Sequence, residues 1–268
     1  LAKKTKTQCL MIRNVVMIGT GKLAQALSPV LLENGIHIMQ FFSRELTHAQ
    51  NLADQFNTDY TNNWNELNRV ADLYIICVKD DAISEVSEAI SKQLDHTANI
   101  CHTSGSRGIE AISTYFTHRA CMWPMQSFTF QSKIIWPEVP IFLSGTDSIL
   151  NEIEVVCKKF SKKVFRIDEE KKKWVHVAAV FANNFSNYNL SITEKILDSC
   201  GVPLEVMEPM MQNMIRNVFT IGPGNTQSGP ANRGDRKTLE MQQKMLADKF
   251  PEYENLYQLY SEIISQKK

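Results

Sequence analysis

The spacing of hydrophobic residues alternates between two patterns over the first part of the chain. Short runs of β-branched and aliphatic residues predict buried strands, and each is followed by a segment with apolar residues at helical spacing. The predicted strands are residues 14–18, 36–42, 73–78, 98–102, 119–122, 139–143 and 163–167. The predicted helices are residues 23–35, 44–56, 81–94 and 148–160. This order is typical of an α/β fold, a Rossmann-type doubly wound, mainly parallel sheet with helices on both faces.

Beyond residue 168 the hydrophobic spacing is helical throughout. The predicted helices there are residues 169–200, 204–220, 236–250 and 251–265. The stretch 222–235 is rich in glycine and proline and predicts a long rigid loop. We therefore expect two domains, residues 1–167 with the sheet and residues 168–268 built only of helices.

The charge balance, the cysteines and the N-terminal residues limit the partners, metal sites and cellular location that we expect. Lys plus Arg and Asp plus Glu both number 29, so net charge gives no support to a nucleic-acid or membrane-surface partner. The lysine groups, including residues 171–173, are interpreted as solvated surface. Six cysteines without metal-ligand spacing predict no metal site and a reducing compartment. Residues 1–8 lack the apolar stretch of a signal peptide and are interpreted as a floppy leader, so we expect a cytoplasmic protein.

A glycine turn joins the first predicted strand to its helix. It reads Gly19-Thr20-Gly21-Lys22-Leu23-Ala24, a GxGxxA pattern. Gly19 suits a tight turn, Gly21 lets the backbone approach a pyrophosphate, and Ala24 permits close packing of helix on strand. The helix N-terminus offers N–H groups to phosphates. The alternative is a glycine-rich turn without a ligand.

The end of the second strand indicates which dinucleotide the turn would bind. An NAD site usually has Asp or Glu here to hold the ribose 2′-hydroxyl. This chain has Ser43 and Arg44, which suit a 2′-phosphate, so we predict NADP. In the alternative interpretation, Arg44 is an exposed residue of the first helical turn and Glu45 holds the ribose. A methyl donor bound by a similar turn is the chemical rival.

A hydroxyl-rich turn follows the strand at 98–102. Ligands of doubly wound sheets bind beyond the carboxyl ends of the strands, so Ser104 and Gly105 are candidate cofactor contacts. His102 is a candidate for proton transfer, because histidine changes charge near neutral pH. The alternative for His102 is a histidine whose hydrogen bonds are satisfied at a strand end.

Residues 174–193 contain no charged side chain. Apolar residues follow one stripe at steps of three and four, and His176, Asn183 and Asn187 fall on the opposite face. We expect this helix to be buried on both faces. Buried amides need hydrogen-bond partners. A polar ligand between the domains, a subunit interface and bonds within the protein all remain open.

Two charged residues stand out in the predicted loop at 222–235. Arg233 is a candidate for binding an anionic substrate or a phosphate. Asp235 is a good N-cap for the helix that follows it. The alternative interpretation is a structural turn stabilised by Asp235.

Together, these motifs resemble a known family. The glycine turn, VKDDAI at 78–83, HTSGS at 102–106, WPMQSF at 123–128 and GPANRGD at 229–235 occur in this order. The chain from residue 11 onward resembles Rossmann-like oxidoreductases whose second half is a conserved domain of unknown function. That family is similar to pyrroline-5-carboxylate reductase, deazaflavin-dependent NADP reductases and 6-phosphogluconate dehydrogenase.

The resemblance implies an NADP-binding domain, a helical domain that often forms a dimer, and a cleft between them. It implies that the backbone of residues 19–23 wraps the pyrophosphate and that Ser43 and Arg44 meet the 2′-phosphate. Residues implied to line the nicotinamide side are Val78, Lys79, Ser104 and Gly105. One departure is Trp123, where the family usually has His before its Pro-Met pair.

The sequence therefore predicts an NADP-dependent oxidoreductase that acts on a small molecule by hydride transfer and forms a homodimer through the helical domain. Candidates for proton transfer or substrate orientation are His102, His176, Asn183, Arg233 and Asp235. An alternative is an NADP-binding sensor or regulatory protein without turnover, motivated by Trp123. An interaction protein with a vestigial fold is a third hypothesis, which the intact glycine turn disfavours.

Overall fold

The computed structural model describes residues 12–129 and 133–266. The leader expected at residues 1–8 lies outside them. The chain divides into two compact units, Leu1–Asn187 and Tyr188–Lys268. Among the described residues after 168, helices are the only regular elements, and our domain boundary there remains a prediction.

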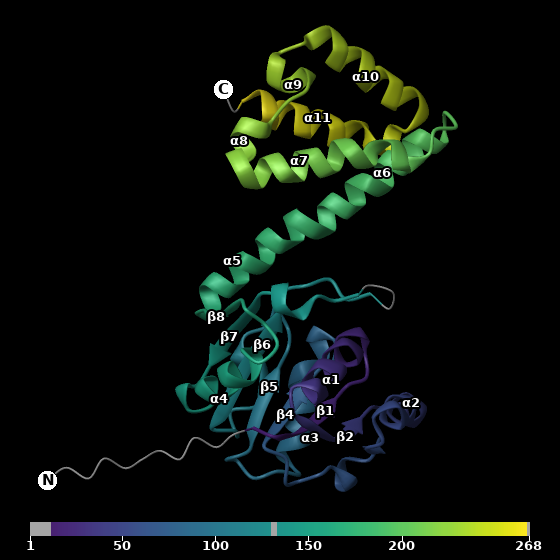
Figure 1. Cartoon of the computed structure of the whole chain (residues 1–268). Coiled ribbons are helices and arrows are strands. Elements are labelled where there is room, and N and C mark those ends of the chain that lie inside the picture. Colours follow the sequence, from purple (N-terminus) through teal and green to yellow (C-terminus); the bar gives the residue numbers. More distant parts are fainter. Residues whose placement is uncertain (1–11, 130–132, 267–268) are drawn as a thin grey trace, which may run out of the picture. The chain divides into compact units, whose positions relative to one another are not determined.

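The first unit contains a single sheet (Figure 1), which has eight strands among the described residues. The strands are β1 (Asn14–Ile18), β2 (His37–Phe42), β3 (Asp59–Thr61), β4 (Leu73–Ile76), β5 (Asn99–His102), β6 (His118–Pro124), β7 (Ile141–Gly145) and β8 (Val164–Arg166). Their order is β3-β2-β1-β4-β5-β6-β7-β8, and the pair β6–β7 is the antiparallel one among these strands. The mainly parallel Rossmann-type sheet is confirmed. Sequence missed β3, whose three residues are too few to show a period.

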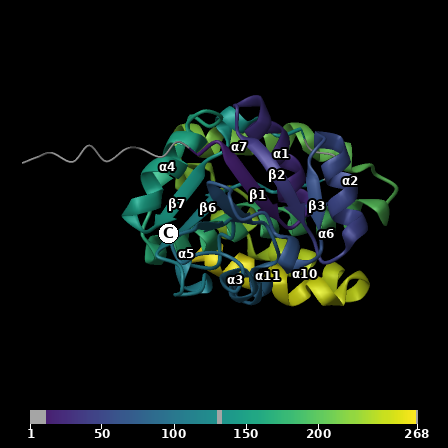
Figure 2. The ribbon, with the colours of Figure 1, turned by 90° about the horizontal axis from the view of Figure 1, so that it is seen from below.

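Helices cover both faces because neighbouring residues of each strand point to opposite sides. Val15 and Met17 pack with α1 (Lys22–Glu33), α2 (Leu46–Phe56) and α4 (Asp147–Cys157). Figure 2 shows α1 and α4 on one side of the strands and α3 on the other. Val16 and Ile18 face α3 (Ile83–Ser91) and the 3₁₀ helix η3 (Ile109–Ala111). Strand order reverses between β1 and β4, where ligands bind in such sheets.

Helical structure begins again at Glu169. It consists of α5 (Glu169–Ala179), the π-helix η5 (Val180–Phe185) and α6 (Ser186–Asp198). The prediction that this segment is buried on both faces is wrong for the single chain, because Trp174 is 69% and Phe181 is 65% exposed. The absence of charge therefore does not reflect burial within one chain.

The second unit continues with short and long helices. They are η6 (Leu204–Met207), α7 (Glu208–Ile221), α8 (Pro223–Thr226), α9 (Pro230–Arg233), α10 (Arg236–Lys249) and α11 (Pro251–Ser265). The long rigid loop predicted at 222–235 is wrong, because α8 and α9 lie there. Pro223 and Pro230 are each the first residue of a helix. Proline is well tolerated there, because the N–H group that it lacks would have no partner within the helix. Helix α10 packs against α11. No helix in the described ranges is long and apolar enough to cross a membrane.

Candidate functional site

A cavity of about 630 Å³ opens where the strand order reverses. It lies beyond the carboxyl ends of β1, β2 and β4 and is lined by residues that follow each of these strands. Gly19, Thr20, Gly21, Ser43, Arg44, Val78 and Lys79, all predicted from the sequence, line it. Lys22 and Leu23, also predicted, do not line the cavity. The Leu23 side chain packs against the core, so that only the backbone of Leu23 remains a candidate phosphate contact.

The glycine turn has the geometry that a phosphate site needs. Gly19 has φ +107°, and a Cβ there would collide with the Cys77 carbonyl, so only glycine fits. Gly21 precedes α1 as its N-cap, and a Cβ built on it meets no described atom within 4 Å. No acidic residue and no side-chain cap occupies the first turn of α1. Its N–H groups therefore face the open space in front of Gly21.

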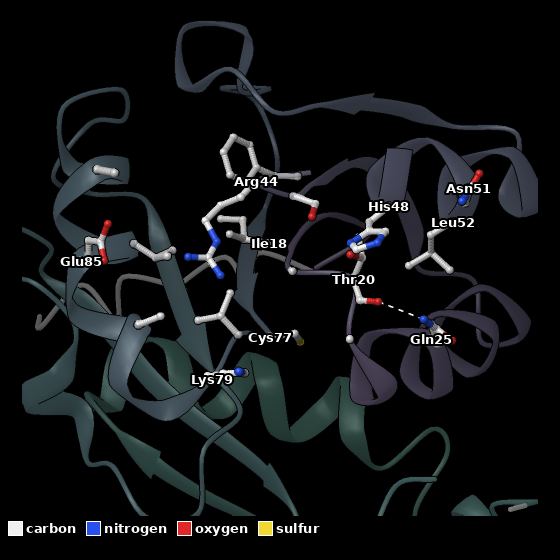
Figure 3. Close-up of a pocket in the computed structure, with 18 of the residues that line it drawn as sticks. Ile18, Thr20, Gln25, Arg44, His48, Asn51, Leu52, Cys77, Lys79 and Glu85 are labelled. Carbon is white, nitrogen blue, oxygen red and sulfur yellow. Dashed lines mark hydrogen bonds between the residues drawn. The ribbon is translucent and has the colours of Figure 1, made fainter. Parts of the chain in front are cut away.

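Basic and hydroxyl side chains stand beside this turn. Figure 3 shows Arg44 extending into the cavity, with Thr20 and His48 on one side and Glu85 on the other. The Arg44 guanidinium forms no hydrogen bond or ion pair with any described residue, and Ser43 is close to it in sequence and also lines the cavity. Sequence reasoning missed His48, although its position four residues after Arg44 was a usable signal.

Glu45 was the alternative partner for a ribose. It is the N-cap of α2 and does not line the cavity. The structure thus gives no support to the NAD-type arrangement at this position.

Part of the cavity lining is apolar. Trp64 and Phe42 stack with ring centroids 3.7 Å apart, and both line the cavity. Val78, Ala82 and Val86 add aliphatic side chains to the lining. A flat ring system of a purine's size suits such a lining, because aromatic and aliphatic surfaces pack well on ring faces.

His102 is fully buried and both ring nitrogens are used by the protein. The Ser104 amide donates to Nδ1 (3.1 Å), so Nε2 carries the hydrogen and donates to the Gly108 carbonyl (3.1 Å). Burial, followed by the positive charge of Lys172, lowers the pKa of His102 to about 4. This geometry favours the satisfied-histidine alternative over the proton-transfer role.

The Ser104-Gly105 turn lies outside the cavity lining and meets two aromatic side chains. A Cβ on Gly105 would collide with the Trp123 indole and would lie 2.8 Å from Cδ2 of His176. Trp123 and His176 are in edge contact, with centroids 5.6 Å apart. The Ser104 hydroxyl accepts the Ser106 and Arg107 amides. His176 therefore lies next to the Ser104-Gly105 turn and next to Trp123, the residue that departs from the family pattern.

Lys172 corrects the interpretation of residues 171–173 as solvated surface. Its side chain is fully buried and forms an ion pair with Glu169 at 3.0 Å. Lys171 and Lys173 are exposed as expected. No sequence signal separates the middle lysine from its neighbours.

Of the remaining predicted residues, Asn183 belongs to the first unit, and Arg233 and Asp235 belong to the second. Asn183 is exposed in the π-helix η5, and its side chain has no hydrogen-bond partner among the described residues. Arg233 is exposed at the end of α9. Asp235 accepts the Thr238 amide at 3.2 Å and is the N-cap of α10, as the sequence indicated. In the described ranges, no group of three His, Cys, Asp or Glu is placed to hold a metal.

Two family models match the chain. Residues 14–102 match the NADP oxidoreductase domain described as coenzyme F420-dependent, and residues 139–264 match a domain of unknown function, DUF2520. The comparison with curated proteins yields no match.

Solved structures are similar over nearly the whole chain. A Bacteroides fragilis protein, provisionally named an NADP oxidoreductase, is 31% identical with a TM-score of 0.87, over 95% of this chain and 98% of that one. An imine reductase from Myxococcus stipitatus in complex with NADP+ has 14% identity and a TM-score of 0.68, over 94% and 92%. A pyrroline-5-carboxylate reductase from Coxiella burnetii has 13% identity and a TM-score of 0.59, over 95% and 99%. The last two similarities show the fold.

Proposed function

Because this chain belongs to the family that joins an NADP oxidoreductase domain of the F420-dependent type to the domain of unknown function DUF2520, we propose that it is an NADP-dependent oxidoreductase that acts on a small molecule by hydride transfer. The observation that carries the proposal is the cavity itself. It combines a glycine turn open in front of Gly21 with the guanidinium of Arg44, which pairs with no described residue and follows the next strand. No comparison favours the sensor without turnover.

The residues of the cavity fit the adenosine, 2′-phosphate and pyrophosphate parts of NADP. The backbone of residues 19–23 holds the pyrophosphate at the N-terminus of α1. Ser43, Arg44 and His48 hold the 2′-phosphate, since guanidinium, imidazole and hydroxyl groups all donate hydrogen bonds to phosphate oxygens. The stacked rings of Phe42 and Trp64 would pack against the adenine. Bound NADP supplies the hydride chemistry, and the protein supplies position and electrostatics.

His176 is the best placed of the five predicted catalytic residues. It contacts the Gly105 turn, which the family resemblance assigns to the nicotinamide side, and it is partly exposed. Its imidazole would donate a proton to the substrate or accept one from it as the hydride moves. Asn183 would orient a polar group of the substrate. Arg233 and Asp235 remain predictions of the sequence without added support.

We propose the same partners as the sequence predicts: a small-molecule substrate and a second copy of the chain, in the cytoplasm. Exposed apolar side chains of the second unit support a homodimer. They include Met210, Ile215, Phe219, Met241 and Met245. Large exposed apolar patches mark protein–protein contact sites.

Calorimetric titration with NADPH and NADH tests the cofactor. We expect NADPH to bind more tightly, and Arg44→Ala to weaken NADPH about 10- to 100-fold while NADH changes little, because a hydrogen bond to a charged group contributes about 1.5–3 kcal/mol. Arg69→Ala is the matched control, since Arg69 is an exposed arginine bonded to Gln93. A folded protein that binds neither dinucleotide refutes the proposal.

A further inference from the structure

The loop that follows the Ser104-Gly105 turn is held by charged groups that the proposed chemistry does not use. Lys172, in the first turn of α5, is fully buried. Its ammonium donates to the Arg107 carbonyl at 2.5 Å and pairs with Glu169 at 3.0 Å. A buried ammonium is costly unless paired and hydrogen-bonded, so this arrangement has a strong geometric preference.

Glu169 holds the same loop from its other carboxylate oxygen. Its Oε1 accepts the Ile109 amide at 3.3 Å, while its Oε2 faces Lys172. Burial raises the pKa of Glu169, but the nearby Ser144 hydroxyl and the Lys172 ammonium lower it by more, so the carboxylate stays charged. The Lys172–Glu169 ion pair is thus hydrogen-bonded to the backbone at Arg107 and at Ile109, on both sides of Gly108.

Further hydrogen bonds join this segment to the Ser104-Gly105 turn and to the cavity. His102 donates to the Gly108 carbonyl and accepts the Ser104 amide, which ties the two ends of the loop together. The Ser106 hydroxyl donates to Asp80, the residue that follows the cavity residue Lys79. The loop is therefore fixed to the cofactor cavity on one side and to α5 on the other.

We infer that Lys172 and Glu169 are positioning residues, which clamp the backbone at 107–109 and thereby set the Ser104-Gly105 turn against His176. The inference rests on the proposed function, in which this turn lies at the nicotinamide half of NADP. Gly105 has no room to move toward Trp123 or His176, because even a Cβ would collide there. Release of the clamp would free the turn to move away from Trp123 and His176, and the contacts that the turn would make with a bound nicotinamide would be lost.

Comparison of two ligands tests the clamp by binding alone. In the proposed arrangement, NADPH would reach from the cavity to the turn, whereas adenosine 2′,5′-bisphosphate would occupy only the part of the cavity proposed for the adenosine. In calorimetric titrations, Lys172→Met is expected to weaken NADPH about tenfold and to leave the bisphosphate unchanged, since misplaced contacts lose the advantage of preorganisation. A general loss of structure would weaken both ligands.

Lys171→Met is the matched control, because Lys171 is the exposed neighbour that pairs with Asp168 at the surface. We expect it to bind both ligands like the unmodified protein. Equal losses for both ligands in Lys172→Met, or no loss for either, would overturn the inference. If the unmodified protein binds neither ligand, the proposed function is wrong, and the inference that rests on it is wrong as well.

Two further measurements keep the inference testable should Lys172→Met fold poorly. Glu169→Leu combined with Lys172→Met replaces the pair with apolar groups, a change that buried ion pairs often tolerate, and it should show the same selective loss. In the unmodified protein, NADPH should slow hydrogen exchange of the amides at 103–110 and 169–176, and the bisphosphate should not. Protection by NADPH at 103–110 but not at 169–176 would show that the clamp does not couple the two segments.

Discussion

Single positions in the site are restricted by backbone conformation and close contact. Gly19 has both restrictions, a positive φ and the adjacent Cys77 carbonyl. Gly35 has only the first, with φ +73° and no described atom within 4 Å of an added Cβ. Substitutions at Gly19 and Gly35 therefore distinguish the effect of the close contact in the turn from the effect of a positive φ alone.

We predict that Gly19→Ala abolishes measurable NADPH binding, because the turn must shift to relieve the collision. Gly35→Ala should bind NADPH normally and lose roughly 1 kcal/mol of stability, the usual cost of a side chain at positive φ. Calorimetric titration and urea unfolding of both variants provide the check. NADPH binding by Gly19→Ala at near-normal affinity would contradict the phosphate role of the turn.

His102 predicts a dependence of stability on pH. Its pKa is about 4 in the folded chain, below the 6.5 of free histidine, so between these values the unfolded state binds more protons. The stabilisation is fully present above about pH 6.5 and is lost as the pH falls toward 4. The difference amounts to roughly 3 kcal/mol.

Urea unfolding at pH values from 4.5 to 7.5 measures this effect. His102→Gln should show a correspondingly flatter dependence, since glutamine does not titrate. Equal slopes in the two proteins would show that His102 does not stay neutral in the fold.

Among the helices, α10 offers a test of a predicted cap. Asp235 accepts hydrogen bonds from the amide and the hydroxyl of Thr238, and these bonds lower its pKa. Asp235→Ala should lower Tm by roughly 2–4 °C and leave NADPH affinity unchanged if the residue acts as a cap. Asp248→Ala, at an exposed position near the other end of α10, is the control and should not lower Tm. A loss of substrate turnover without a change in Tm would instead favour the catalytic role.

For the chain as a whole, the proposed homodimer predicts a mass in solution about twice the 30.6 kDa of one chain. Phe219 is 87% exposed in the single chain, and Phe219→Ser should raise the concentration at which the dimer dissociates. Val70→Ser is the control, because Val70 is 75% exposed in the first unit. Light scattering across a dilution series measures both, and a monomer at all concentrations would refute the proposal.

The order of strands and helices, the glycine turn and the Ser43-Arg44 pair were all readable from the sequence. These features depend on neighbouring residues alone: hydrophobic period, glycine conformation and the position of a side chain just after a strand. The start of α11 and the cap at Asp235 follow from the same local rules. For this reason seven of the residues that line the cavity were predicted from the sequence, whereas their binding of NADP stays a proposal.

Other features came from contacts between distant parts of the chain. Lys172 has the same local pattern as Lys171 and Lys173, and its burial arises because α5 packs on a loop some 65 residues earlier. Both ring nitrogens of His102 are hydrogen-bonded because Gly108 and Ser104, later in the chain, lie beside the ring. The exposed face of 174–185 and the short strand β3 likewise had no local signal. Periodicity shows which residues can share a face, but the burial and partners of a side chain depend on what packs against that face.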